Sequence, residues 1–142
     1  MQETETGAAG IYRSDAGAKE EIMRALKIDA AAKTITEIDI QEGKLLERAY
    51  AEIGCTMIET AWSSEIYPDG TYDTIYVDEE GLFNPIPNWF KVKGVHKPFA
   101  GNGVVSGVNS EDGETCAAKI SLATLAAMVT FHSMAEIRHE LL

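Results

Sequence analysis

The chain has 142 residues, of which 45% are hydrophobic and 25% charged, and its formal net charge is −11. A chain of this length and composition folds around one core, so we expect a single globular domain. The acidic balance argues against direct nucleic-acid binding, because the phosphate backbone repels a negative surface. An acidic surface can instead mimic DNA towards a basic protein, which stays an alternative.

The sequence contains no targeting or membrane signal. The N-terminus lacks a positively charged segment followed by an apolar one, and no run of about 18 apolar residues occurs. We therefore expect a soluble cytoplasmic protein without membrane association. Cys55 and Cys116 lie far apart and belong to no C-x-x-C or Cys/His cluster, so two buried thiols are expected rather than a zinc or redox site.

The first 20 residues differ in composition from the rest of the chain. They are small, polar and glycine-containing, and only Ile11 and Tyr12 can anchor them. We interpret residues 1–20 as a mobile N-terminal arm that precedes a domain of residues 21–142.

Two alternating segments, IMRALKID and KTITEIDI, follow the arm and predict a β-hairpin with its link at residues 29–33. The alanines of the link are weak turn formers, so a helical turn there stays an alternative. In the second segment, Ile35, Ile38 and Ile40 share one face of the strand if a one-residue irregularity follows Thr36.

Residues 42–53, EGKLLERAYAEI, have the 3.6-residue period of a helix, and Gly54 predicts its end. The expected apolar face consists of Leu45, Leu46, Ala49, Tyr50 and Ile53. Strands are predicted in CTMIETAWSSEIY and TYDTIYVDEEG, on either side of a turn at residues 68–70. Another turn is expected at residues 78–81.

Residues 102–109, NGVVSGVN, predict a strand that another backbone approaches closely, because glycines surround its β-branched centre. Ser121 predicts the cap of a last helix over residues 121–137. The candidate buried residues of this helix are Leu122, Leu125, Ala126, Val129, Met128 and His132. A strand-rich middle with these helices predicts an α+β domain, in which a mainly antiparallel sheet is packed by the C-terminal helix and one shorter helix.

Several of these segments resemble a family of small phage and plasmid proteins of unknown function. The segments are MRALKIDAAAKTITEIDI, IYVDEEGLFNPIPN and KPFAGNGVVSGVNSEDGET, followed by the helix start KISLATL. The resemblance covers about residues 23–130 and leaves the first 22 outside. It implies an accessory protein of a mobile element, acting in the host cytoplasm, and implies no reaction. A looser likeness connects this build to phage proteins that sequester nucleotide signals against host defence.

Motifs for catalysis, metals and cofactors are missing from the sequence. The pattern GNGVVSG has the glycine spacing of a dinucleotide loop, but no helix follows it directly, so we expect a glycine-kinked strand. His132 and His139 have no carboxylate or thiol to complete a metal site. No acid, base or nucleophile pair can be named, so no catalytic residue, metal or cofactor is assigned and the sequence favours a non-enzymatic protein.

The most informative stretch is residues 81–110, which contains no Asp or Glu in an otherwise acidic chain. Aromatic faces there could stack on a ring, and lysines could bind phosphate oxygens. The candidate ligand-binding residues are Trp89, Phe90, Lys91, Lys93, His96, Lys97 and Asn102. The competing interpretation places Trp89 and Phe90 in the core or in a dimer interface, with lysines that only keep a loop soluble.

Two functional hypotheses follow from the sequence. The first is a binder of a small anionic, nucleotide-like ligand at the lysine and aromatic stretch. The alternative is an acidic interaction module that acts on a basic host protein. A homo-oligomer, most simply a homodimer, is also expected, because a small sheet protein must cover its strand edges and its aromatic residues Trp62, Trp89, Phe90 and Phe99.

Overall fold

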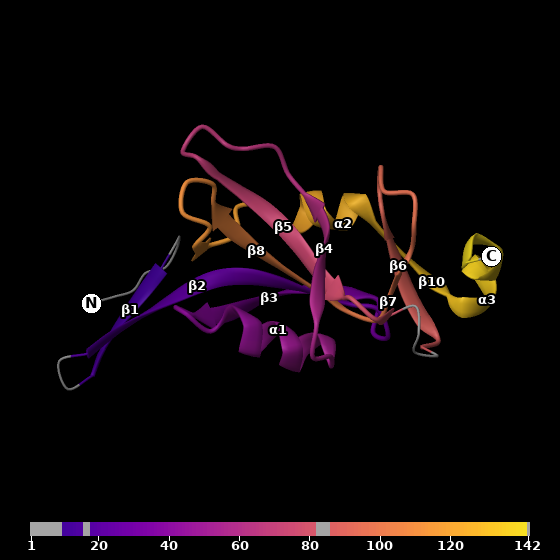
Figure 1. Cartoon of the computed structure of the whole chain (residues 1–142), viewed down its shortest axis with the longest axis horizontal. Helices are drawn as coiled ribbons and strands as arrows, with labels where there is room; N and C mark the ends of the chain where they lie inside the picture. The colour runs from indigo at the N-terminus through magenta and orange to yellow at the C-terminus, as the bar shows by residue number, and fades with distance from the viewer. Residues whose placement is uncertain (1–9, 16–17, 82–85, 142) are drawn as a thin grey trace.

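The computed structural model describes residues 10–15, 18–81 and 86–141, which form two antiparallel sheets with short helices. This architecture confirms the predicted α+β domain. The larger sheet has the order β1-β2-β8-β5-β4, with β3 beside β2 and β9 beside β8 (Figure 1). Its strands are β1 (Gly10–Asp15), β2 (Ala18–Asp29), β3 (Thr34–Gln41), β4 (Ile58–Ser63), β5 (Thr71–Asp78), β8 (Gly103–Asn109) and β9 (Thr115–Cys116).

The smaller sheet has the order β10-β6-β7 and lies at the opposite end of the molecule from β1 (Figure 1). Its strands are β6 (Asn88–Val92), β7 (Phe99–Ala100) and β10 (Val129–Ser133). The described helices are α1 (Leu45–Ile53), α2 (Leu122–Met128) and α3 (Met134–Ile137), and a final 3₁₀ turn covers Arg138–Leu141.

The hairpin predicted after the arm is confirmed, because β2 and β3 pair antiparallel from Ile22↔Gln41 to Asp29↔Thr34. The register is unbroken, so the irregularity expected after Thr36 is wrong. Without it, Ile35 lies on the opposite face from Ile38 and Ile40, as strand alternation requires.

Both faces of the larger sheet are covered, which explains why β3 has isoleucines on both of its faces. One face packs α1 against Ala25, Ile40 and Val104. The other face packs against α2 and the smaller sheet, through a cluster that contains Leu26 and Phe90. A strand buried on both faces needs no strict alternation, so every residue from Gly103 to Val108 in β8 is buried.

Helix α1 begins at Leu45, three residues later than predicted, because the chain turns at Gly43 with a φ of 79°. Its predicted end is confirmed: Gly54 is left-handed, and its N–H donates to the Tyr50 carbonyl at 2.8 Å. Ala49 is buried against the sheet, as expected. Leu46 was also expected on the apolar face, but it is 53% exposed.

The turn predicted at residues 68–70 is also confirmed, and it connects to β5. Gly70 takes a φ of 87°, and its N–H donates to the Tyr67 carbonyl. The Asp69 carboxylate accepts from the backbone N–H of Thr71, as expected of an aspartate in a turn.

The single helix predicted over residues 121–137 is wrong: α2 ends at Met128, a strand follows, and the helical conformation returns only in α3. Ser121 does cap α2, and its hydroxyl accepts from the N–H of Thr124. At Val129, however, the chain enters β10, which pairs with β6. The run Val129 to Phe131 is β-branched and aromatic, and such residues favour a strand once a partner strand is beside them. Of the expected buried stripe, Leu125 and Val129 are buried, while Leu122 is exposed.

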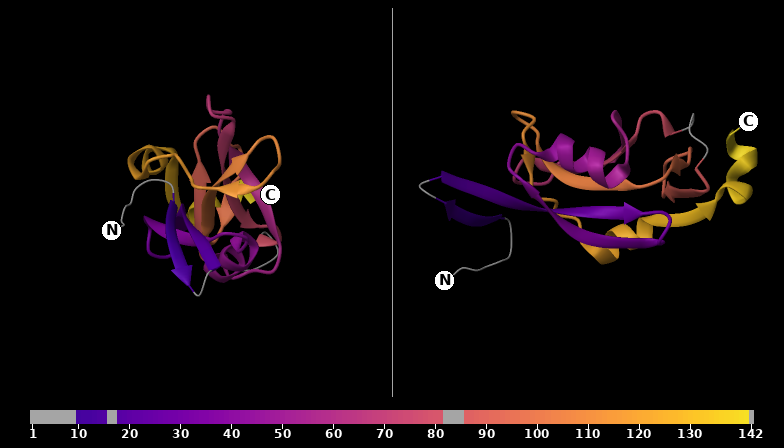
Figure 2. Two further views of the ribbon diagram at one scale, coloured as in Figure 1. Left: turned by 90° about the vertical axis from the view of Figure 1, so that its left-hand side faces the viewer. Right: turned by 90° about the horizontal axis from the view of Figure 1, so that it is seen from below.

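Residues 10–15 of the predicted arm form β1, which pairs with β2 as a hairpin that projects from the body (Figures 1 and 2). Residues 1–9 lie outside the described residues. The mobility of the arm therefore stays a prediction.

Candidate functional site

The two aromatic residues of the predicted ligand site lie in the core. Trp89 and Phe90 are at most 1% exposed, and the Trp89 indole N–H donates to the Ile86 carbonyl at 2.7 Å. The ring of Phe90 packs 5.6 Å from that of Phe99, measured between centroids. These two rings have no free face on which a ligand could stack in this structure. Trp89 and Phe90 are core residues, as in the competing interpretation.

Two of the predicted lysines are paired with glutamates from distant segments. The Lys91 ammonium lies 3.0 Å from a carboxylate oxygen of Glu140, and that of Lys97 lies 3.6 Å from one of Glu59. Lys93 and His96 are exposed in the connection between β6 and β7. The local excess of positive charge seen in the sequence is therefore largely cancelled by folding.

The Asn102 side chain forms hydrogen bonds to the backbone of two other segments. Its side-chain oxygen accepts from the N–H of Ala30 at 2.9 Å, and its amide nitrogen donates to the Glu52 carbonyl at 3.1 Å. It thereby ties the β2–β3 link and the end of α1 to the start of β8. The seven predicted residues do not converge on one cavity.

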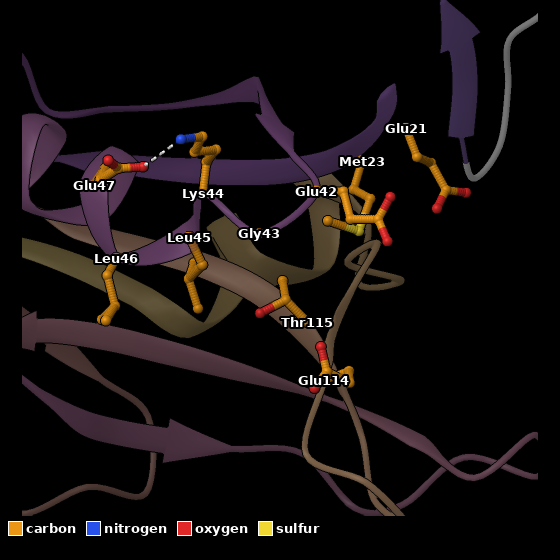
Figure 3. Close-up of a pocket in the computed structure, with 10 residues that line it drawn as sticks. All are labelled: Glu21, Met23, Glu42, Gly43, Lys44, Leu45, Leu46, Glu47, Glu114 and Thr115. Carbon is orange, nitrogen blue, oxygen red and sulfur yellow. Dashed lines mark ion pairs between the residues drawn. The ribbon is translucent and has the colours of Figure 1, made fainter. Parts of the chain in front are cut away.

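A pocket of about 580 Å³ lies instead beside the first turn of α1 (Figure 3). Three segments line it: the middle of β2, the connection from β3 into α1, and the turn before β9. The lining residues are Glu21, Met23, Glu42, Gly43, Lys44, Leu45, Leu46, Glu47, Glu114 and Thr115. We call this cavity the acidic pocket.

The acidic pocket combines four carboxylates with an apolar part. Its one ammonium, that of Lys44, lies 3.4 Å from a carboxylate oxygen of Glu47. Among the ion pairs of the described residues, none involves Glu21, Glu42 or Glu114. Three uncompensated carboxylates therefore line the same pocket as Met23, Leu45 and Leu46, a combination that suits a cation on an apolar stem.

A second cavity, of about 480 Å³, adjoins the acidic pocket and shares Lys44 and Glu47 with it. It adds the carboxylate of Asp39 and the guanidinium of Arg48. Arg48 is itself held by Glu52, with 2.9 Å between the nitrogen and the oxygen. The lining of this second cavity thus holds two acidic and two basic side chains, so the excess of carboxylates is confined to the acidic pocket.

The buried carboxylate of Asp73 has a structural role, because both of its oxygens already accept hydrogen bonds from the protein. Its two oxygens accept from the N–H groups of Lys119 and Ile120 and from the Tyr67 hydroxyl, at 2.6 to 2.9 Å. Burial, followed by the hydrogen bond to Asp73, raises the pKa of Tyr67, so this hydroxyl stays a donor at neutral pH.

The remaining candidates for reactive chemistry are weak. Cys55 and Cys116 are free thiols, and both are partly rather than fully buried. Burial raises the pKa of each thiol, which disfavours the nucleophilic thiolate at neutral pH. Within the described residues, no group of three His, Cys, Asp or Glu side chains is placed to hold a metal ion. The side chain of His139 lies outside the described residues.

The sequence reading missed the acidic pocket because its carboxylates come from three distant segments. Glu21, Glu42 and Glu114 each look like an ordinary surface acid in the sequence. The register of the predicted hairpin was the available signal. Continuing the pairing one residue beyond Ile22↔Gln41 places Glu21 opposite Glu42.

The fold and the pocket define a small α+β domain with a carboxylate-lined pocket. The chain belongs to the family described as a domain of unknown function, DUF3846, whose model matches residues 23–129. The match extends from β2 to the first residue of β10, and it includes Glu42 and Glu114 but not Glu21.

The comparisons with curated proteins and with solved structures found no match. In the part of the chain that the structure describes, no helix is long and apolar enough to cross a bilayer.

Proposed function

We propose that this protein is a non-enzymatic interaction module whose acidic pocket binds a basic segment of a partner protein. One observation carries the proposal: the uncompensated carboxylates of Glu21, Glu42 and Glu114 line a partly apolar cavity. A lysine or arginine side chain matches both features, because its stem packs on apolar atoms while its charged head meets carboxylates. Complementary charge also steers a basic partner towards the pocket.

The resemblance of the sequence to phage and plasmid proteins supports a partner from the host. A mobile-element protein of this kind would meet its target in the host cytoplasm, and a basic host protein is the target that the acidic pocket fits. The net charge of −11 adds long-range attraction to such a partner.

The anionic-ligand hypothesis has less support. Binding an anion at Lys91 or Lys97 requires each ammonium to leave a glutamate, and Trp89 has no free face on which a ring could stack. A test that separates the two functions therefore compares the acidic pocket directly with these lysines.

The test uses a hexa-arginine peptide and inorganic phosphate as probes, with binding followed by backbone amide NMR shifts. The peptide is expected to shift the signals of residues 42–47 and 114–115. In the double variant Glu42→Gln with Glu114→Gln, we expect its affinity to fall about tenfold at low salt, because two charge contacts are lost.

The matched control is Glu65→Gln with Glu79→Gln, which removes the same charge from exposed positions outside the acidic pocket. An equal loss of affinity in both double variants would mean unspecific attraction and would overturn the proposal. Phosphate shifts around Lys91 and Lys97, abolished in the Lys91→Ala, Lys97→Ala variant, would support the anion binder instead.

A further inference from the structure

The β1–β2 hairpin has little support from the rest of the chain. Among the described strands, β1 pairs with β2 only, and the ribbon of these two strands extends beyond the body (Figures 1 and 2). A ribbon of two strands is marginally stable in water unless a further strand or layer covers it. This geometry raises the question of what pairs with the outer edge of β1.

Two backbone hydrogen bonds show which way the polar groups of β2 point. The N–H of Glu42 donates to the Glu21 carbonyl at 2.9 Å, and that of Ala118 donates to the Arg24 carbonyl at 2.8 Å. The N–H and C=O groups of odd-numbered residues in β2 therefore point towards β3. Those of even-numbered residues point towards β1 and β8.

The same alternation divides the residues of β1. Ile11 and Arg13 lie opposite the even residues Ile22 and Glu20, so their backbone groups bond to β2. Tyr12, opposite Glu21, directs its N–H and C=O away from β2, and so do Gly10 and Ser14. The outer edge of β1 thus offers a regular row of donors and acceptors.

The other long edges of the larger sheet carry features that oppose pairing with a second copy. Along β3 the outward residues include Glu37 and Asp39, and the two registers that keep most of the strand paired place acid opposite acid. Along β4 the register shifts between Thr60 and Trp62, an irregularity of the kind that blunts an edge.

The edges of the smaller sheet are short. At one side, β7 has two residues. At the other, the N–H of Ser133 in β10 is already bonded to the Glu136 carboxylate. The row on β1 has no bulge, no proline and no lysine, so it is the least protected edge among the described strands.

We propose that two copies of the chain pair through their β1 edges and form a two-fold dimer with a continuous four-stranded ribbon. A register centred on Tyr12 uses the outward groups of both copies and places Ile11 opposite Arg13 of the second copy. No like charges face each other there. A shift by two residues in one direction puts Arg13 opposite Arg13 of the second copy, and a shift in the other direction leaves only residues 10–12 of β1 paired. The proposal is independent of the acidic pocket.

The first test replaces Tyr12 by proline or by alanine. Tyr12→Pro removes an outward N–H but no bond to β2, and an edge strand accepts proline at such a position. Sedimentation velocity at micromolar concentrations should show wild type at about twice the chain mass of 15.4 kDa and Tyr12→Pro as a monomer. Tyr12→Ala keeps the N–H, and we expect its dimer to weaken about tenfold or less.

A cysteine test covers the case in which the proline variant disturbs the hairpin. In a background with Cys55→Ser and Cys116→Ser, Tyr12→Cys should form a disulfide-linked dimer under mild oxidation, because the register places the two residues directly opposite. Glu37→Cys on the β3 edge is the matched control: it keeps the β1 pairing but should form no disulfide-linked dimer. A monomeric wild type, or equal cross-linking of both cysteine variants, would overturn the proposal.

Discussion

At the residue scale, Gly107 is the glycine, among those the structure describes, with the least room for a side chain. A Cβ atom built on Gly107 would overlap the carbonyl oxygen of Ala117 and lie 3.0 Å from the sulfur of Cys116. The φ of Gly107 is not in the left-handed region, so the requirement comes from the close approach alone. Gly107 is the last glycine of the GNGVVSG pattern. The close contact gives it a packing role rather than a phosphate-binding one.

We predict that Gly107→Ala lowers the free energy of unfolding by about 1–3 kcal/mol, because the segment that follows β9 must move away from β8. Urea denaturation measures the change. Gly94→Ala is the control: Gly94 has a φ of 86° but no atom near its missing Cβ, so it reports only the backbone cost of about 1 kcal/mol. Equal losses in the two variants would contradict the close-contact explanation.

The candidate site shows what residue-level sequence reading can and cannot provide. The absence of acids from residues 81–110 is real in the sequence, but Glu59 and Glu140 reach Lys97 and Lys91 only in the folded chain. Charge along a sequence therefore predicts charge on a surface poorly when ion pairs join distant segments. The same limit hid the acidic pocket, whose carboxylates are brought together only by the fold.

At the element scale, a group of charges around Glu52 holds α1 on the larger sheet. Its carboxylate accepts from Lys27 of β2, with 2.9 Å between nitrogen and oxygen, and from Arg48 one turn earlier in α1. The hydrogen bond from Lys27 lowers the pKa of Glu52 from 4.5, burial opposes this shift, and the charges of Lys27 and Arg48 reinforce it. Glu52 therefore links the helix to β2 in its ionised form.

A lowered pKa in the folded state means that the stabilisation is present above pH 4.5 and is lost as the pH falls below that value. We predict that Glu52→Gln lowers the free energy of unfolding by about 0.5–1 kcal/mol at pH 7, and by less at pH 3. Denaturation at both pH values checks this. Glu47→Gln, at an exposed pair with Lys44, should change stability less at pH 7; a pH-independent effect of Glu52→Gln would contradict the ion-pair explanation.

The elements that sequence reading identified correctly are those with a local cause. Gly54 ends α1 through its own left-handed conformation, and the chain turns at residues 68–70 because Gly70 takes a positive φ and the Asp69 carboxylate accepts from the N–H of Thr71. The strand β10 has no such cause, because its apolar residues suit a short helix equally well until β6 lies beside them. One long helix was therefore predicted where the structure has the helix α2, the strand β10 and the short helix α3.

At the scale of the whole molecule, one hydrophobic cluster joins the two sheets. It contains Leu26 and Ile75 of the larger sheet together with Phe90 and Val129 of the smaller one. Phe99 of β7 and Val92 of β6 belong to the same cluster, so all three strands of the smaller sheet contribute to the shared core. Because sheets that share a core cannot separate without exposing it, the two should unfold together.

The two tryptophans allow this cooperativity to be tested, since Trp62 lies in β4 of the larger sheet and Trp89 in β6 of the smaller one. In the Trp62→Phe variant, fluorescence reports the smaller sheet through Trp89, while far-ultraviolet circular dichroism reports the whole fold. We predict that the two urea midpoints coincide within error, because the shared cluster gives a single two-state transition. The Trp89→Phe variant repeats the comparison from the larger sheet. A fluorescence midpoint below the dichroism midpoint in Trp62→Phe alone would show instead that the smaller sheet unfolds first as an independent unit.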